Sequence, residues 1–391
     1  MVFCMSLIET PVGFIMGRFI IGLGLATFVA NQFWASSLFS PNVVGLANAT
    51  SAGWGNLGGG ITQFLTSALY VGLLNSYSPF SAWRRVFFIH GCFHILAGLM
   101  VLAVGQDMPE GNYSDLKASG SMRKMTSVDA TRVFYAGVLN YRTWILVLNY
   151  AFCFGVELTV NNIITPYFVD QFGLKQVIAG TVGGLFGFMN TFARSSGGLV
   201  SDMIGKKSGM RGRLWAYWLC QTLEGVACIA MGLAYKSLTA TVILMIVFSF
   251  FVQASEGAAY GVVPFVSKRA LGVVSGFVGA GGNAGAVINQ RLWFFGDKYE
   301  TYDGIVYMGI LIICVTATLV FVHFPMWGGM FTKGQTEFLE EDYYLKDYTE
   351  EEIAAGYGND AVKFAGLARE QLRGEKGLKD YESSVHGAGK A

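Results

Sequence analysis

Five charged side chains lie within long apolar stretches of this sequence: Arg18, Glu157, Arg194, Glu224 and Glu256. A charge at the centre of a bilayer costs about 2.5–3.5 kcal/mol on insertion scales, so such residues usually bind an ion, carry a proton or pair with one another. Arg194 stands in FARSSGG, among small residues suited to the interior of a helix bundle. Its planar guanidinium can donate two parallel hydrogen bonds to a flat oxyanion. Spacing also allows a second interpretation, because water lies within about 10 Å along the helix and a long side chain can reach it.

The other four charges give less specific predictions. Glu157, in FGVELTVNN, is near the middle of its apolar stretch. A buried carboxylate can take up and release a proton, or it can be a static partner of Arg194, and the residues leave both roles open. Arg18 is near the end of its stretch, where an arginine typically reaches the interface or holds helices together. No role follows for Glu224 or Glu256.

Two glycine-rich segments each surround one asparagine. AGWGNLGGG (52–60) contains Asn56, and SGFVGAGGNAG (275–285) contains Asn283. Close helix packing explains most of these glycines. A buried amide, however, needs hydrogen-bond partners, and equivalent polar breaks in two halves of a chain are typical of a transporter's central site. A P-loop is not indicated, because neither segment follows a strand or ends in GK[ST].

Metal-binding and catalytic patterns are weak. His90 and His94 are four residues apart in HGCFH, but no second histidine pair accompanies them. The six cysteines show no CxxC spacing and are interpreted as small buried hydrophobes. GxSxG and HExxH motifs are absent from the sequence. We therefore predict no catalytic residues, no metal site and no cofactor.

The elements that must position these side chains are membrane-spanning helices. Of 391 residues, 53% are hydrophobic and only 14% are charged, against about 25% charged in soluble proteins. A span needs about 20 apolar residues, and the runs are continuous rather than alternating, which excludes a β-barrel. We predict an all-α polytopic membrane protein, with residues 1–10 forming a further half-crossing at which the chain begins inside a helix. The nine predicted spans are 12–34, 43–73, 85–105, 143–168, 176–203, 214–235, 239–266, 271–296 and 304–326.

The charges between spans predict orientation and domain organisation. The connections 106–142, 204–213 and 267–270 hold five, four and two Lys/Arg, eleven in all, whereas the opposite connections hold six. The side with eleven should be cytoplasmic. We predict a first helix bundle in 1–105, a cytoplasmic loop in 106–142, a second bundle in 143–326 and a cytoplasmic tail in 327–391. The tail has 13 Asp/Glu against 8 Lys/Arg, and we expect it to be solvated and partly disordered.

Several motifs resemble those of one transporter family. AGWGNLGGG and GAGGNAG are similar to the two signature segments of the nitrate/nitrite porter family of the major facilitator superfamily, and FARSSGGLVSD and MRGRLW are further matches. The tail EDYYLKDYTEEE resembles the plant and algal members. This resemblance implies a fold of twelve helices in two halves. The nine spans would be helices 4–12 and residues 1–10 the end of helix 3, so the fold would be incomplete at its N-terminus.

The resemblance also implies a substrate site. Arg194 matches an arginine of helix 8 that holds nitrate, while the partner arginine of helix 2 has no counterpart here. Aromatic and glycine-rich positions of the family match further substrate-binding residues. These are Tyr150, Phe154, Phe28, Asn56, Gly53, Asn283, Gly282 and Gly279.

The expected function is secondary active transport of nitrate, or of nitrite, by alternating access. The resemblance to this family also implies proton symport, with Glu157 of the ELT motif as the coupling group. The expected partners are nitrate or nitrite, protons, the lipid bilayer of the plasma membrane and a small accessory membrane protein, with no nucleic acid. Two alternatives remain: another major facilitator carrier of small anions or sugars, and a truncated sensor that does not transport.

Overall fold

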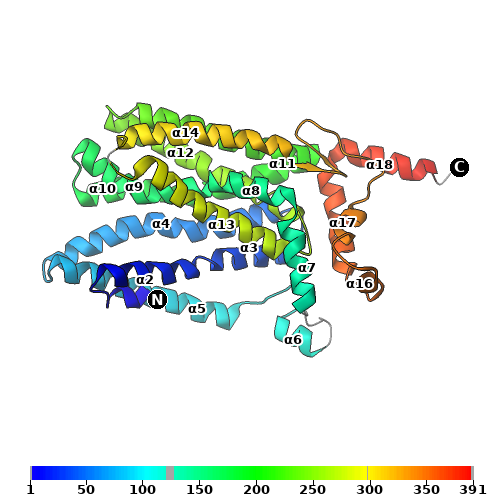
Figure 1. Ribbon diagram of the computed structural model, residues 1–391, viewed down its shortest axis with the longest axis horizontal. Coiled ribbons are helices and arrows are strands. Elements are labelled where there is room, and N and C mark those ends of the chain that lie inside the picture. Colours follow the sequence, from blue (N-terminus) through cyan, green and yellow to red (C-terminus); the bar gives the residue numbers. More distant parts are fainter. Residues whose placement is uncertain (1, 120–126, 297, 389–391) are drawn as a thin grey trace.

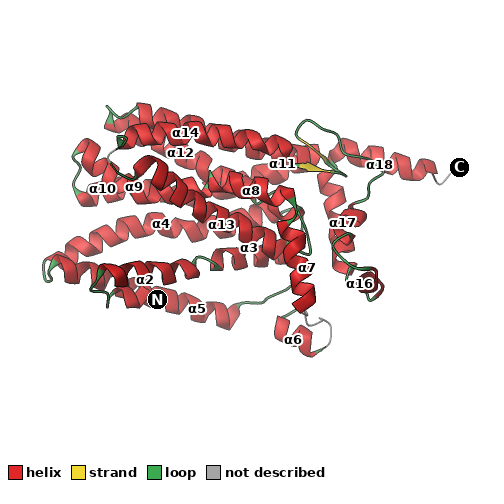
Figure 2. Cartoon of the chain, in the orientation of Figure 1, coloured by secondary structure: helices red, strands yellow, loops and turns green. Residues whose placement is uncertain are grey.

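Helices make up most of the computed structural model, which describes residues 2–119, 127–296 and 298–388. Long helices run side by side, and short helices gather at one end of them (Figures 1 and 2). Eight segments of the described residues are long and apolar enough to cross a membrane, and one of them, Gln176–Leu233, contains two of the nine predicted spans. The predicted all-α class is therefore confirmed.

The chain forms a first group of helices, a second group and a tail. The first group is α1 (Val2–Met5), α2 (Pro11–Gly24), α3 (Thr27–Leu38), α4 (Val44–Leu74) and α5 (Pro79–Val104), followed by the short α6 (Tyr113–Ala118) and α7 (Ser127–Val138). The second group is α8 (Tyr141–Ala151), α9 (Phe154–Phe172), α10 (Gln176–Phe188), α11 (Ala193–Leu233), α12 (Leu238–Ala259), α13 (Leu271–Asn289) and α14 (Thr301–Thr316). Single turns of 3₁₀ or π helix follow at Met189–Thr191, Val263–Phe265, Gln290–Phe294 and Ala317–Phe321. The tail holds β1 (His323–Phe324), which pairs antiparallel with β2 (Gly328–Gly329), and then α15 (Glu340–Leu345), α16 (Glu350–Ala354), α17 (Asn359–Leu372) and α18 (Gly374–Ala388).

Local chemistry explains where several helices begin and end. Thr10 accepts a hydrogen bond from the Gly13 amide and Pro11 occupies the first turn of α2, both typical helix starts. Gly173 ends α9 in the left-handed conformation that only glycine adopts without strain. Within α11, Gly209 has φ 65° and ψ −154° and breaks the helical path. The residues on either side of this break lie against one another, since Gly212 packs on Ile204 and Arg213 pairs with Asp202 at 2.7 Å. The predicted connection 204–213 is therefore a tight turn between two helices that the bounds of α11 join.

The two groups meet along α3 and α4. Helix α4 packs against α10, α11 and α12, and α3 packs against α13. Figure 1 shows α3 and α4 running beside this second group. Residues from both groups are thereby brought to one interface.

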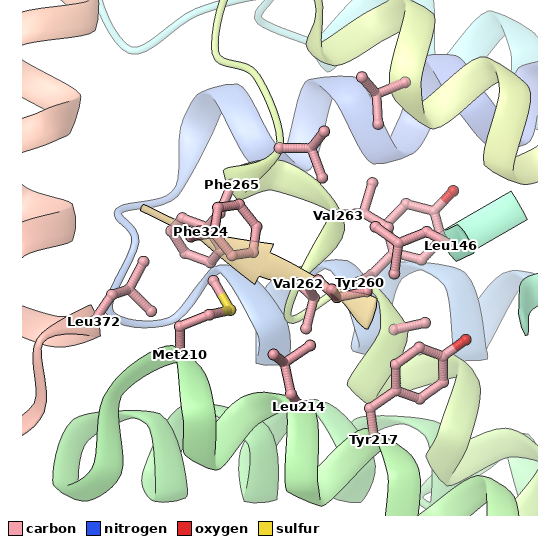
Figure 3. Packing of buried hydrophobic residues seen from close by; sticks show 14 of the residues in the cluster. Leu146, Met210, Leu214, Tyr217, Tyr260, Val262, Val263, Phe265, Phe324 and Leu372 are labelled. Atoms are coloured by element: carbon pink, nitrogen blue, oxygen red, sulfur yellow. The ribbon is translucent and has the colours of Figure 1, made fainter. Parts of the chain in front are cut away.

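The prediction of a solvated, partly disordered tail is wrong where the tail packs against the second group. Leu372 of α17 and Phe324 of β1 join a core cluster with Met210, Leu214 and Phe265 of the second group (Figure 3). Buried aromatic residues and paired charges thus offset the acidic composition that suggested solvation.

Ion pairs tie the tail to the helix ends. Arg269 makes two hydrogen bonds to the Glu352 carboxylate, at 2.7 and 2.6 Å. Nearby, the buried Arg213 pairs with Asp202 at 2.7 Å, and Asp202 also accepts a hydrogen bond from the Leu46 amide at the start of α4. These contacts join the tail, the second group and the first group at one end of the bundle.

The cysteines do not all lie in the core. Cys153 and Cys228 are buried as expected, but Cys4, Cys92 and Cys314 are exposed. The prediction is wrong for these three because an apolar residue of a spanning helix fits the outer, lipid-facing side as well as the interior.

Candidate functional site

Arg194 lies in the interior of the protein and not at its surface. It is the second residue of α11, directly after the single turn Met189–Thr191, and its side chain is 0% exposed. Neither a lipid-facing nor a water-reaching side chain fits that burial. The interpretation in which the guanidinium reaches water is therefore wrong for this structure.

Two carboxylates and one phenol surround the guanidinium. Nη1 pairs with Glu256 of α12 in a direct hydrogen bond and lies 3.6 Å from Oε2 of Glu157. Nη2 donates to the Tyr150 hydroxyl at 2.7 Å. Nε has no hydrogen-bond partner within the described residues. A single buried cation is thus shared between acids from α9 and α12.

Amides from both helix groups hold Glu157. Asn190 donates to Oε1 at 2.7 Å, and Asn56 of α4 donates to Oε2 at 3.0 Å. Asn56 therefore reaches Arg194 through the carboxylate between them. The first glycine-rich segment contributes to the site, which spans the interface between the two groups.

Stacked aromatic rings lie against the guanidinium. Phe28 of α3 and Phe154 of α9 stack with centroids 5.4 Å apart, and Tyr150 stacks on Phe154 at the same separation. The Arg194 Cζ atom is 5.6 Å from the centroid of Phe28 and 5.8 Å from that of Phe154. Cation–π attraction at these distances favours a positive charge here.

The three glycines of the predicted site allow close approach to these side chains. A Cβ on Gly53 would lie 3.0 Å from the Arg194 Cβ, and one on Gly282 would lie 2.4 Å from Phe154 Cδ1. Gly279 lies beside Phe28, at 3.7 Å from Cδ1 by the same measure. Asn283 is different, because its amide donates to the Gly279 carbonyl of its own helix at 3.0 Å.

The structure adds residues that the sequence did not assign. Glu256 stood out only as a charge in an apolar stretch, and its pairing with Arg194 requires α11 and α12 to lie side by side. Asn190 precedes Arg194 by four residues, a helical spacing that was available as a signal. Tyr260, just beyond α12, packs edge-to-face on Tyr150 at 5.4 Å.

Other polar positions lie outside this cluster. Arg18 is exposed on α2. The His90 ring nitrogens lie near the Thr66 hydroxyl and the Val86 carbonyl, at 3.3 and 3.0 Å. In the part of the chain that the structure describes, no group of three or more His, Cys, Asp or Glu residues is arranged to hold a metal ion.

The arrangement provides a fixed, planar cation screened from water. In such surroundings attraction between opposite charges is several-fold stronger than in bulk water. An anion that replaces a carboxylate on the guanidinium would therefore bind at the interface of the two groups.

Comparisons with known proteins agree with this architecture. The sequence profile of the Major Facilitator Superfamily matches residues 1–289. Nitrate transporter 2.2 of Chlamydomonas reinhardtii is 45% identical over 386 residues, which cover 97% of this chain and 74% of that protein. High affinity nitrate transporter 2.5 of Arabidopsis thaliana is 48% identical over 360 residues, or 92% of this chain and 71% of that protein. The human organic anion transporter MFSD10 superposes with a TM-score of 0.55 at 12% identity, over 81% of this chain and 73% of that one, a likeness of fold alone.

Proposed function

The chain belongs to the major facilitator superfamily and, within it, to the family of the plant and algal nitrate transporters, and we propose that it holds nitrate on the guanidinium of Arg194. It is a multi-pass membrane protein that transports nitrate. We call this proposed binding site at the Arg194 guanidinium the nitrate seat. The observation that supports it is the complete burial of Arg194 where the two helix groups meet. Nitrite, which is also flat and singly charged, suits the same seat.

Nitrate and Glu256 would compete for the same N–H groups of the guanidinium. In this structure the Glu256 carboxylate pairs with Nη1 of Arg194 and offsets its charge. Nitrate is planar and presents pairs of oxygens that match the guanidinium fork. Binding therefore requires Glu256 to move or to lose its negative charge, since nitrate, Glu157 and Glu256 would otherwise place three negative charges on one buried cation.

Three aromatic rings beside the guanidinium, those of Phe28, Phe154 and Tyr150, form an aromatic wall that gives a basis for selecting flat anions. Phe154 stacks face to face with both Phe28 and Tyr150. A tetrahedral anion such as sulfate is thicker than nitrate in every orientation, and its hydration is costlier to remove. The wall therefore favours nitrate over sulfate or phosphate.

We propose proton symport, with Glu157 as the coupling group at Arg194. Its carboxylate lies 3.6 Å from Nη1 and is held by Asn56 and Asn190. A proton on Glu157 removes one negative charge next to the guanidinium, which offsets the charge that nitrate brings. Proton and anion would then enter together and leave together.

Residues 1–105 and 143–326 form the proposed halves that rock about this seat, joined by the connection 106–142. Helices α6 and α7 of that connection and the tail helices α16–α18 lie at the same end of the bundle (Figure 1). The excess of Lys/Arg in the predicted connections supports a cytoplasmic position for this end, the C-terminal tail included. We also propose that the protein lies in the plasma membrane and binds a small accessory membrane protein. Co-purification from native membranes tests that partner.

Nitrate uptake into liposomes that contain the purified chain tests the seat. Arg194→Lys keeps the charge but cannot contact Tyr150 and an anion with one planar fork. Loss of a charged hydrogen bond costs about 1.5–3 kcal/mol, so the KM for nitrate should rise about ten- to hundredfold. Arg18→Lys, the same change at an exposed arginine, is the matched control and should behave as the wild type.

Two results would contradict the proposal. Equal uptake by Arg194→Lys and Arg18→Lys would remove the guanidinium from the substrate site. Stronger competition by small organic anions or sugars than by nitrite would favour a different carrier of the superfamily.

A further inference from the structure

A third buried acid, Glu224 of α11, takes no part in the contacts of Arg194 described above. Its side chain is fully buried, with a relative exposure of 0%. Among the described residues, no Lys, Arg or His forms an ion pair with it. Oε1 has no hydrogen-bond partner there, and Oε2 has one, the Ser255 hydroxyl of α12 at 2.7 Å.

The hydrogen atoms of this contact can be counted. The Ser255 Oγ lies 2.7 Å from Glu224 Oε2 and also 2.7 Å from the Val252 carbonyl oxygen. A hydroxyl carries one hydrogen, and a carbonyl oxygen only accepts. Ser255 therefore either donates its hydrogen to Glu224 Oε2, or donates it to Val252 and accepts a hydrogen from a protonated Glu224 carboxyl group.

The neighbouring charges favour the protonated, neutral state of the Glu224 carboxyl group. Two further carboxylates act on this group, Glu157 of α9 and Glu256 of α12, and the nearby cation, Arg194, is already held by both. An ionised Glu224 would thus add a third negative charge to a buried region with one positive charge. Among the described residues, the other titratable groups that interact with Glu224 are thiols and a phenol, none of which can carry a positive charge, namely Cys153, Tyr217, Cys220 and Cys228.

We propose that Glu224 holds a proton in this conformation and is a second proton-carrying group of the transport cycle. The inference deepens the proposed symport and rests on it. In the step, the O–H bond at Glu224 breaks, the proton passes to water when the site opens on one side of the membrane, and a carboxylate remains. Uptake of a proton from water on the other side restores the acid, with no change of oxidation state.

Infrared spectroscopy of the purified full chain tests the proton directly. A protonated carboxyl group has a C=O stretching band that carboxylates lack. Glu224→Gln, which keeps the shape without a titratable group, should remove one such band, and strong alkali should remove it reversibly from the wild type. Ser255→Ala should shift the band, because the carboxyl group loses its hydrogen-bond partner. Cys228→Ser, one turn along α11 from Glu224, is the control and should leave the band in place.

Transport measurements test the role in the cycle. Liposomes with Glu224→Gln should exchange nitrate across the membrane, but their accumulation of nitrate under an inward proton gradient should fall at least tenfold. An unchanged infrared band in Glu224→Gln and Ser255→Ala, or full gradient-driven accumulation by Glu224→Gln, would overturn the inference. If the wild-type chain moves no nitrate, the proposed function fails, while the infrared bands still decide whether Glu224 holds and releases a proton.

Discussion

Replacing Gly282 with alanine tests whether the aromatic wall shapes the nitrate seat. The new Cβ would lie 2.4 Å from Phe154 Cδ1 and 3.1 Å from Tyr150 Cδ1. Phe154 has little room to retreat, because Phe28 stacks on it at 5.4 Å with planes only 10° apart. Forcing an extra methyl group into a packed site costs about 1–3 kcal/mol. If that strain falls on the wall, the KM for nitrate should rise about 5- to 150-fold.

The same glycine-rich segment offers a matched control. A Cβ on Gly276 would meet its nearest atom, Val29 Cγ1, at 3.9 Å, which is an ordinary contact. Alanine also favours the helix by nearly 1 kcal/mol relative to glycine. Gly276→Ala should therefore keep the wild-type KM and a thermal unfolding temperature at least as high. The assays are nitrate uptake in liposomes and thermal unfolding in detergent.

Each outcome of this pair has a clear meaning. A normal KM for Gly282→Ala would show that Phe154 and Tyr150 do not shape the substrate site. An equal loss in both variants would show that the glycines act through general helix packing, and the reasoning from local distances would be wrong.

Three further predictions concern charged residues. Glu157→Gln should retain nitrate exchange and the infrared band of the buried carboxylic acid but lose the dependence of uptake on a proton gradient; unaltered gradient dependence would exclude Glu157 as the coupling group. Asp202→Asn leaves the buried Arg213 without its counter-charge, which should cost about 3–5 kcal/mol and lower the thermal unfolding temperature, whereas an unchanged temperature would show that the pair is not needed. Hydrogen bonds from Arg269 lower the pKa of Glu352 from its ordinary 4.5 to about 2. The folded tail therefore gains this stabilisation fully above pH 4.5 and loses it as the pH falls toward 2, so proteolysis of the tail should increase with acidification, and less steeply in Arg269→Gln.

Apolar length was enough to predict the helices, because each span depends on about 20 consecutive residues and not on distant contacts. The segments 12–34 and 239–266, for example, correspond to the structural segments Pro11–Leu38 and Leu238–Phe265. At Gly209 the positive φ breaks the helix inside the predicted connection 204–213, so the sequence placed the break between two spans but not the residue at which it falls.

The tail shows why composition alone misled. Its acidic residues indicated solvation, but Tyr343 and Tyr344 are 2% and 1% exposed, and Arg269 pairs with Glu352 from a connection 83 residues earlier in the chain. Net charge counts residues without regard to partners, and the partners here come from distant parts of the sequence.

The sequence by itself determined the kind of fold and the presence of ionisable groups within its spans, since both are properties of short continuous segments. Only the tertiary structure decided that Arg194 faces inward, that Glu157 and Glu256 share its charge, and that Glu224 forms no ion pair with a cation of the described residues. Spacing along one helix fixes how far a side chain reaches but not which neighbouring helix it meets. Those neighbours decide whether a buried charge is paired, neutral or available to a substrate.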